Sequence, residues 1–142
     1  MRAYFDTSAF LKLLVQEPGS TTALGVWHTA LHVAAASVLF AEASAGLAAA
    51  RRAGRLTAGA HSSSRRDLWR CWADLEVVLP DGPLCERAGL LAERERLRGY
   101  DAVHLAAALE YEADMLVCGD GDLIDAALNS GIGVIDARGP GE

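Results

Sequence analysis

Short apolar runs alternate with longer stretches of helical periodicity along the whole chain. The short runs are bounded by polar or turn-forming residues, which is typical of strands, and they fall at residues 2–5, 32–36, 75–79, 114–118 and 132–135. The intervening stretches predict helices at residues 7–16, 20–30, 37–53, 57–73, 84–97, 101–112 and 121–129. This alternation predicts an α/β fold built on a mainly parallel sheet of about five strands.

The chain length favours one domain spanning residues 1–142. A domain of this size buries roughly 70% of its unfolded-state surface, which suffices for one core. Pro18-Gly19 and the turn at residues 80–83 interrupt the pattern, but neither is long enough to be a linker. Only residues 139–142 are expected to form a loose tail.

Apolar runs in the chain fall short of the ~18 residues that span a bilayer, and the N-terminus lacks the apolar core of a signal peptide. We therefore expect a soluble cytoplasmic protein with no membrane contact. Cys71, Cys85 and Cys118 are odd in number and widely spaced, which fits neither a disulfide framework nor a paired zinc site. We expect buried or inert thiols.

Charge is distributed unevenly. The net charge of −6 argues against a protein that coats nucleic acid by electrostatics alone. Residues 51–70 nevertheless hold six arginines, including Arg51 and Arg52, against the single acid Asp67, so this segment carries +5 and the rest −11. The segment is either a solvated helix face or a surface that binds phosphates.

Asp6 follows the first predicted strand and precedes the first predicted helix. Open α/β sheets bind ligands at the carboxyl ends of their strands, where this carboxylate would lie. The alternative is a helix N-cap, a role for which Asp is well suited.

Glu42 is the only charged residue between Ser37 and Arg51, in an otherwise apolar helix. A buried carboxylate costs several kcal/mol unless it is paired or binds a cation. The alternative is that Glu42 lies on a weakly polar, solvent-facing side of the helix.

Acidic residues at two further places in the chain are also candidate ligands. Asp101 begins a charge-free helix, with His104 one turn later on the same face. A helix cap next to a hydrogen-bonded core histidine would also explain this pair, and we do not expect His104 to bind metal. Asp120 and Asp122 follow the fourth strand, where an ordinary Gly/Asp turn is the alternative.

Acids that converge at one sheet edge normally require a cation, because each close pair repels by up to about 4 kcal/mol at an effective dielectric near 20. Ligands that are all oxygen atoms indicate Mg²⁺ or Mn²⁺ rather than Zn²⁺. Such cations, held by carboxylates, are suited to phosphodiester hydrolysis.

These motifs resemble the PIN-domain ribonucleases, and within them the VapC-type toxins of toxin–antitoxin pairs. The resemblance covers nearly the whole chain and rests on three segments: residues 4–9 (YFDTSA), residues 40–43 (FAEA) with the following arginines, and residues 100–106 (YDAVHLA), which are the most specific. It implies a three-layer α/β/α fold with strand order 3-2-1-4-5. The implied activity is endoribonucleolytic.

The resemblance also implies the site residues. Asp6, Glu42, Asp101 and Asp120 would form an acidic quartet that holds one or two Mg²⁺ or Mn²⁺ ions and performs catalysis, with Thr7 or Ser8 assisting substrate binding through a hydroxyl group. Cys118 stands where the family usually has Thr. Because Asp122 offers a second carboxylate nearby, the fourth acid is the least certain metal ligand.

The partners implied are RNA, a cognate antitoxin that blocks the acidic site, and a second copy of the chain in a homodimer. Arg51 and Arg52 would hold RNA phosphates. The apolar side chains of the first two helices would form either such interfaces or simply core, and these are Phe10, Leu11, Leu14, Val26 and Trp27.

Three other classes compete. A haloacid-dehalogenase phosphatase needs a second Asp where Ser8 stands, and a phospho-receiver domain needs a late lysine, whereas Lys12 is the only lysine. A catalytically inactive PIN-like binding or scaffolding module stays open, because the sequence does not show that the metal site is assembled.

Overall fold

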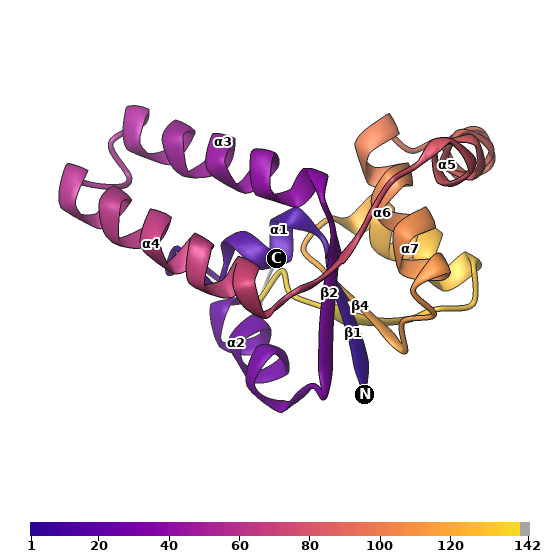
Figure 1. Ribbon diagram of the computed structural model, residues 1–142, viewed down its shortest axis with the longest axis horizontal. Helices are drawn as coiled ribbons and strands as arrows, with labels where there is room; N and C mark the ends of the chain where they lie inside the picture. The colour runs from indigo at the N-terminus through magenta and orange to yellow at the C-terminus, as the bar shows by residue number, and fades with distance from the viewer. Residues whose placement is uncertain (140–142) are drawn as a thin grey trace.

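A five-stranded parallel sheet forms the centre of the computed structural model, which describes residues 1–139 (Figure 1). Its strands are β1 (Arg2–Phe5), β2 (His32–Ala36), β3 (Glu76–Val78), β4 (Met115–Cys118) and β5 (Gly133–Asp136). They lie in the order β3-β2-β1-β4-β5, with every neighbouring pair parallel, so the predicted topology is confirmed. Residues 140–142 of the expected tail lie outside the described part of the chain.

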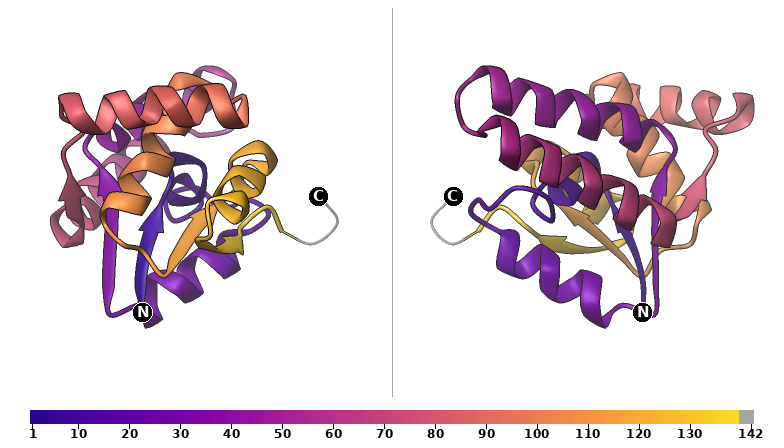
Figure 2. Two further views of the ribbon diagram at one scale, coloured as in Figure 1. Left: turned by 90° about the vertical axis from the view of Figure 1, so that its right-hand side faces the viewer. Right: turned by 60° about the vertical axis from the view of Figure 1, so that its left-hand side comes forward.

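Seven helices surround this sheet in the described residues. They are α1 (Thr7–Leu11), α2 (Ser20–Thr29), α3 (Val38–Arg52), α4 (Ala58–Asp74), α5 (Gly82–Glu95), α6 (Gly99–Glu110) and α7 (Gly121–Asn129). Helices α2, α3 and α4 lie on one side of the sheet and α5, α6 and α7 on the other, as the views in Figures 1 and 2 show. The fold is therefore the predicted three-layer α/β/α arrangement.

Two hydrophobic cores follow from the alternation of side chains along the strands. On β1, Ala3 and Phe5 face the core beneath α1 to α4, whereas Tyr4 faces the core beneath α5 to α7. On β4, Val117 belongs to the first core and Leu116 to the second. Because both faces are covered, the central strands are apolar after their first residues, as in other parallel sheets.

The chain reverses direction across the sheet at β1. From β1 it proceeds outward to β2 and β3 on one side and later returns to β4 and β5 on the other. The carboxyl ends of β1 and β4 thus lie side by side, with nothing crossing between them, and ligands bind at this type of position in open α/β sheets. The topology places the segments after β1 and β4, which carry Asp6 and Asp120, next to each other.

The first helix is shorter than predicted. Residues 7–16 were expected to be helical, but α1 ends at Leu11. The chain then tightens into turns in which Leu13 and Leu14 donate backbone hydrogen bonds to the carbonyls three residues earlier. This places Leu14 in the core and leaves its carbonyl to accept the Ser64 hydroxyl of α4 at 2.9 Å.

Helices α5 and α6 each begin two residues earlier than the periodicity indicated. Asp81 accepts a hydrogen bond from the Leu84 N–H at 3.0 Å and caps α5, so the turn at residues 80–83 includes the start of a helix. Arg98 is the N-cap residue of α6. Asp101 is therefore the third residue of its helix rather than its first, and the N-cap alternative for it was wrong.

The structure also shows how far the cysteines and the apolar side chains of the first two helices are buried. Cys118 is buried and Cys71 partly buried, whereas Cys85 is exposed, so only the inert alternative remains for Cys85. The apolar side chains of α1 and α2 pack into the core or against it, which favours the core alternative over an interface. In residues 1–139, no helix is both long and apolar enough to cross a bilayer.

Gly19 supplies a test of this fold. It has a φ of 90°, and a Cβ there would come 1.8 Å from the carbonyl oxygen of Ala137, just after β5. We expect Gly19→Ala to lower the free energy of unfolding by more than about 2 kcal/mol. Gly25→Ala, at an open position inside α2, is the matched control and should instead raise it by about 0.5–1 kcal/mol. Urea denaturation followed by circular dichroism measures both, and equal effects would contradict the close approach.

Candidate active site

Asp6 lies immediately after β1, with its carboxylate buried to 3% exposure. One carboxylate oxygen accepts the N–H of Ala9 at 2.9 Å, so Asp6 caps α1. The Ser8 hydroxyl is 2.8 Å from both carboxylate oxygens, and the Cys118 thiol is 3.3 Å from Oδ2. Burial raises the pKa of Asp6, and the electrostatic interaction with His104 and these hydrogen bonds partly offset that rise. Asp6 is therefore both a helix cap and a constrained carboxylate at the sheet edge.

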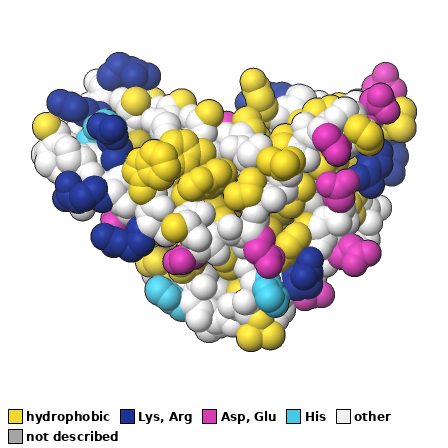
Figure 3. Space-filling view, in the orientation of Figure 1, with side chains coloured by type: hydrophobic (Ala, Val, Ile, Leu, Met, Phe, Trp, Pro, Cys, Tyr) yellow, Lys and Arg dark blue, Asp and Glu magenta, His cyan; other side chains and the backbone are white. Residues whose placement is uncertain are grey.

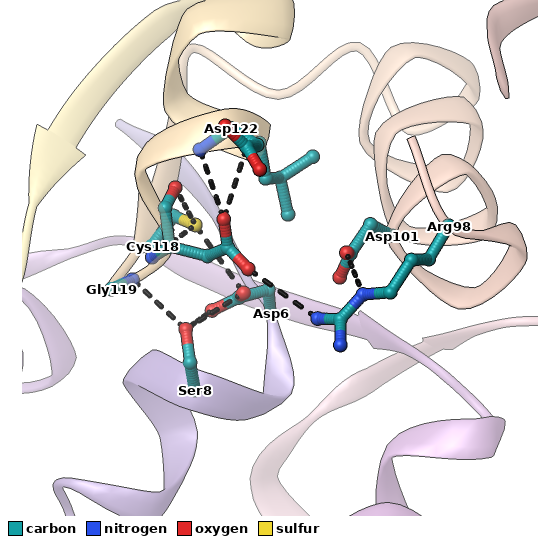
Figure 4. Close-up of polar contacts among 9 residues, drawn as sticks. Asp6, Ser8, Arg98, Asp101, Cys118, Gly119 and Asp122 are labelled. Atoms are coloured by element: carbon teal, nitrogen blue, oxygen red, sulfur yellow. Dashed lines mark hydrogen bonds and ion pairs between the residues drawn. The ribbon is translucent and has the colours of Figure 1, made fainter. Parts of the chain in front are cut away.

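Ser8 and Cys118 join the ends of β1 and β4 around Asp6 (Figure 4). Besides its contact with Asp6, the Ser8 oxygen accepts the N–H of Gly119 at 2.9 Å. The Cys118 sulfur accepts the N–H of Asp120 at 3.2 Å. Burial, and then the charge of Asp6, raise the pKa of the Cys118 thiol far above its ordinary value, so it remains protonated and donates to the carboxylate.

Glu42 points from α3 toward α1 and α6 rather than outward. Its Oε1 accepts the Thr7 hydroxyl at 2.7 Å and lies 2.8 Å from His104 Nε2, and the side chain is 27% exposed. Burial pushes the pKa of Glu42 upward, but the hydrogen bonds from His104 and Thr7 outweigh it, so this pKa lies below its ordinary value. The solvent-facing alternative for Glu42 was wrong.

Asp101 and Asp120 share one cationic neighbour, Arg98. The Arg98 guanidinium donates through Nε to Asp101 Oδ2 at 3.2 Å, and its Nη2 lies 3.6 Å from Asp120 Oδ2. The side chain of Arg98 is 82% exposed and reaches over the site from the start of α6, as Figure 4 shows. Two acids that are 19 residues apart in the chain are thus close enough for a single cation to contact both.

Asp120 and Asp122 differ in orientation. Asp120 caps α7: its Oδ1 accepts the N–H groups of Asp122 and Leu123 at 2.9 and 3.4 Å, and its Oδ2 is directed toward Arg98. The Asp122 side chain is exposed on the first turn of α7 and makes no hydrogen bond or ion pair with residues 1–139. Asp120 is therefore the acid that faces Asp101 across the sheet edge.

Arg51 and Arg52 lie apart from the acids. They end α3, nine and ten residues beyond Glu42, which corresponds to about 14 Å along the helix axis. The hairpin formed by α3 and α4 extends past the sheet in Figure 1, and basic side chains gather on this part of the surface in Figure 3. The structure brings Asp101 and Asp120 to one guanidinium, that of Arg98, whereas Arg51 and Arg52 lie far along α3 from Glu42.

The donor set suits a hard divalent cation, although the side chains are not closed around one. Among residues 1–139, no three His, Cys, Asp or Glu side chains are arranged closely enough to hold a metal ion as they stand. However, the groups that face one another are carboxylate oxygens, and the guanidinium of Arg98 bridges two of them as a positive charge. Oxygen ligands of this kind favour Mg²⁺ or Mn²⁺ over Zn²⁺.

The sequence patterns did not identify three residues that contact the acids or their hydrogen-bond partners. These are Tyr4, Arg98 and His104. Tyr4 is a strand residue whose side chain looks like core, and Arg98 precedes a helix in a charged segment. His104 is buried and hydrogen-bonded, as the core alternative anticipated, but its partner is Glu42. The only available signal was the spacing of Asp101 and His104, which places them one turn apart.

A three-layer α/β/α fold that carries acidic side chains where its parallel sheet reverses direction defines the class of protein to which this chain belongs. The sequence profile of the PIN domain family matches residues 3–128. The chain therefore belongs to the PIN domain family. The match includes Asp6, Glu42, Asp101 and Asp120 in one continuous region.

The chain is similar to named proteins in sequence and to solved structures in fold. Ribonuclease VapC49 and Ribonuclease VapC45, from two Mycobacterium tuberculosis strains, are each 41% identical to this chain over 106 residues, covering 75% of this chain and 74% of the relative. Among solved structures, PAE2754 from Pyrobaculum aerophilum has a TM-score of 0.71 at 23% identity, covering 97% of this chain and 93% of that one. VapC20 from M. tuberculosis, described as a Sarcin-Ricin loop cleaving toxin, has a TM-score of 0.68 at 21% identity, covering 87% and 94%. At these identities, the solved structures show a shared fold.

The raised pKa of Asp6 predicts a stability effect. In the folded chain the ionised carboxylate is disfavoured relative to the unfolded chain, so the free energy of unfolding falls as the pH rises through the folded-state pKa. Asp6→Asn keeps an oxygen that can cap α1 and removes this cost. We expect it to raise Tm by about 2–5 °C at pH 8 in metal-free buffer, which corresponds to about 1 kcal/mol for a chain of this size.

The gain should shrink as the pH falls toward about 4, where the carboxyl group is protonated in both states. Thermal unfolding between pH 4 and pH 8 measures it. Asp81→Asn, at the exposed N-cap of α5, is the matched control and should change Tm by less than about 1 °C. A loss of stability at pH 8 in Asp6→Asn would mean that the hydrogen bonds to this carboxylate outweigh its burial.

Proposed function

We propose that this protein is a divalent-metal-dependent endoribonuclease that acts as the toxin of a toxin–antitoxin pair. The observation that carries the proposal is that Asp101 and Asp120 lie close enough to share one cation, beside the buried carboxylate of Asp6. Membership of the PIN domain family and 41% identity to proteins named ribonucleases support it. The whole chain, residues 1–142, would act as one PIN domain, with a cytoplasmic place of action where RNA is available.

In this proposal Asp6, Glu42, Asp101 and Asp120 hold Mg²⁺ or Mn²⁺, and Asp122 is the weaker candidate for the fourth acid. A cation bound there would supply positive charge that stabilises negative charge on the scissile phosphate and lowers the pKa of the attacking water. The chain itself holds the carboxylates in place. Thr7 and Ser8 were expected to assist with substrate binding. Their hydroxyl groups donate hydrogen bonds to Glu42 and Asp6, respectively, and so orient these acids.

Arginine side chains provide the proposed path for RNA. Arg51 and Arg52 are exposed at the end of α3, and α4 adds Arg65 and Arg66 beside the 61% exposed ring of Trp69. Positive charge holds phosphates, and an exposed aromatic ring provides a surface on which a base can stack. An RNA strand that reaches from these arginines to the acids would have to run along α3.

Two protein partners belong to the same proposal. A cognate antitoxin is supported by the likeness of the fold to the toxin–antitoxin complex from Klebsiella pneumoniae, with a TM-score of 0.67 at 20% identity, covering 96% of this chain and 98% of that chain. A homodimer is proposed from the resemblance to toxins of this type. Leu90 on α5 and Tyr100 on α6 are exposed and apolar, and they supply surface for such contacts.

An RNA cleavage assay tests the proposed activity. Purified protein should cut RNA with Mg²⁺ or Mn²⁺ and stop when EDTA is added. Asp101→Asn should reduce the rate by roughly 10²–10³-fold or more, the usual cost of removing one group that stabilises charge at a reacting centre. Glu93→Gln, which neutralises an exposed acid on α5, is the matched control and should cleave at the normal rate. Retained metal-dependent cleavage in Asp101→Asn and Asp6→Asn would refute the site assignment.

Titration calorimetry with Mn²⁺ separates the nuclease from the scaffolding alternative. A nuclease of this kind must bind the cation, and a scaffold need not. We expect Mn²⁺ binding by the wild-type chain and by Glu93→Gln and weaker binding by Asp101→Asn. Wild-type protein that neither binds Mn²⁺ nor cuts RNA would favour the inactive PIN-like module.

The arginine path makes a separate prediction. Arg51→Ala/Arg52→Ala should weaken single-stranded RNA binding in EDTA and reduce the slope of log affinity against log salt by about 0.7 for each lost phosphate contact. Arg87→Ala/Arg94→Ala removes the same charge from α5 and is the control. Fluorescence anisotropy at several salt concentrations measures the slopes. Equal slopes for the two double variants would assign Arg51 and Arg52 to an ordinary solvated helix face.

A further inference from the structure

A line of three buried or half-buried side chains connects the backbone of β2 to the acid on α3. The Tyr4 hydroxyl accepts the N–H of Ala36, the last residue of β2, at 3.0 Å and lies 2.9 Å from His104 Nδ1. His104 Nε2 in turn lies 2.8 Å from Glu42 Oε1. Tyr4 is fully buried and His104 is 2% exposed. The line therefore runs through a part of the core from which solvent is excluded.

Counting protons along this line fixes the tautomer of His104. The Tyr4 oxygen already accepts the Ala36 N–H, and within residues 1–139 its only other polar neighbour is His104 Nδ1. Its single proton must therefore point at Nδ1, because a buried hydroxyl proton without an acceptor is costly. Nδ1 is then the unprotonated acceptor, and Nε2 carries the hydrogen. In the opposite tautomer, the unprotonated Nε2 would face the Oε1 oxygen of Glu42 at 2.8 Å, so that two hydrogen-bond acceptors would repel each other.

The same line leaves one oxygen of Glu42 without a hydrogen bond. Thr7 and His104 both donate to Oε1, at 2.7 and 2.8 Å. In the described part of the chain, Oε2 accepts no hydrogen bond. The carboxylate is thus held by one oxygen while the other points away from its donors, as expected for a group that is oriented by a histidine and binds a cation with its second oxygen.

Direct ligation by His104 does not fit this geometry. Both of its ring nitrogens are already engaged, one by Tyr4 and the other by Glu42. A cation at Nε2 would displace the hydrogen bond that holds the acid. The ring is also too deeply buried to face an ion that must admit a phosphate and water.

We propose that Tyr4 and His104 are positioning residues. Tyr4 locks His104 in the Nε2–H tautomer, and His104 together with Thr7 fixes Oε1 of Glu42 so that Oε2 serves the divalent cation. This inference rests on the proposed metal site and adds two residues that do not touch the cation. A restrained carboxylate loses less conformational freedom when it binds, so the effect appears in cation affinity.

Nitrogen-15 NMR of the imidazole tests the tautomer on the full chain at pH 8 without metal. Wild-type protein should show Nδ1 of His104 as a bare, pyridine-type nitrogen and Nε2 as a protonated, pyrrole-type nitrogen. Tyr4→Phe removes the hydroxyl proton and should give a mixture of the two tautomers. Tyr111→Phe, at the C-terminal end of α6 with its hydroxyl on Glu76, is the matched control and should leave the spectrum unchanged.

Mn²⁺ titration tests the positioning role. His104→Leu removes the donor and should weaken Mn²⁺ binding by about 10–100-fold, the usual cost of losing a group that orients a metal ligand. His104→Gln places an N–H group near the position of Nε2 and should restore most of that loss. Folding of each variant is checked by circular dichroism, and Tyr4→Phe supplies the same affinity test if His104→Leu does not fold.

The possible results of these experiments test the roles of Tyr4 and His104 and the metal site separately. Wild-type Nδ1 in the protonated form, or a single unchanged tautomer in Tyr4→Phe, overturns the role of Tyr4. Normal Mn²⁺ affinity in folded His104→Leu overturns the role of His104 and leaves the metal site standing. Absence of Mn²⁺ binding by the wild-type chain overturns the proposed metal site and the cation half of this inference, while the NMR result still decides the tautomer.

Discussion

Repulsion between like charges is the constraint around which the carboxyl edge of this sheet is built. Two carboxylates about 4 Å apart repel by roughly 4 kcal/mol at an effective dielectric near 20, and Asp6 is also buried. The chain offsets these costs with local donors: Ala9, Ser8 and Cys118 around Asp6, and Arg98 between Asp101 and Asp120. The remaining excess of negative charge is what makes the edge suitable for a cation.

The same residues also hold the fold together locally. Asp6 and Asp120 cap α1 and α7 through Oδ1. Oδ2 of Asp120 is directed toward Arg98, and Oδ2 of Asp6 accepts the Ser8 hydroxyl and the Cys118 thiol. Ser8 bridges from the Asp6 carboxylate to the N–H of Gly119 and so links the ends of β1 and β4. A capping role therefore does not exclude the proposed binding of a cation, because one carboxylate has enough lone pairs for both.

The two sides of the site are supported differently. Glu42 is held from the buried side through His104 and Tyr4, where the hydrogen bond between Tyr4 and His104 is buried and the one between His104 and Glu42 is partly buried. Asp101 and Asp120 face the exposed guanidinium of Arg98, which solvent screens and which can move without disturbing the core. The first side therefore provides rigidity, and the second provides the exposed surface at which the proposed cation and phosphate would bind.

Hydrophobic periodicity was enough to predict the five strands of the sheet and most helices, because the two cores repeat the alternation along β1 and β4. The strand order came from the resemblance to the PIN domain family. Periodicity was not enough to predict the end of α1 at Leu11, because the contact between Leu14 and Ser64 that follows involves residues 50 positions apart. It also misplaced the start of α6, which depends on Arg98 rather than on a pattern of apolar residues.

By itself the sequence determined which acids are present and that each follows a strand or lies in an apolar helix, since both are local properties. Only the tertiary structure decided that Asp120 rather than Asp122 faces Asp101, that Arg98 stands between them, and that Tyr4 and His104 support Glu42. The physical reason is that hydrogen-bond direction and charge proximity depend on distances across the sheet edge. The strand order fixes these distances, and no spacing along the chain encodes them.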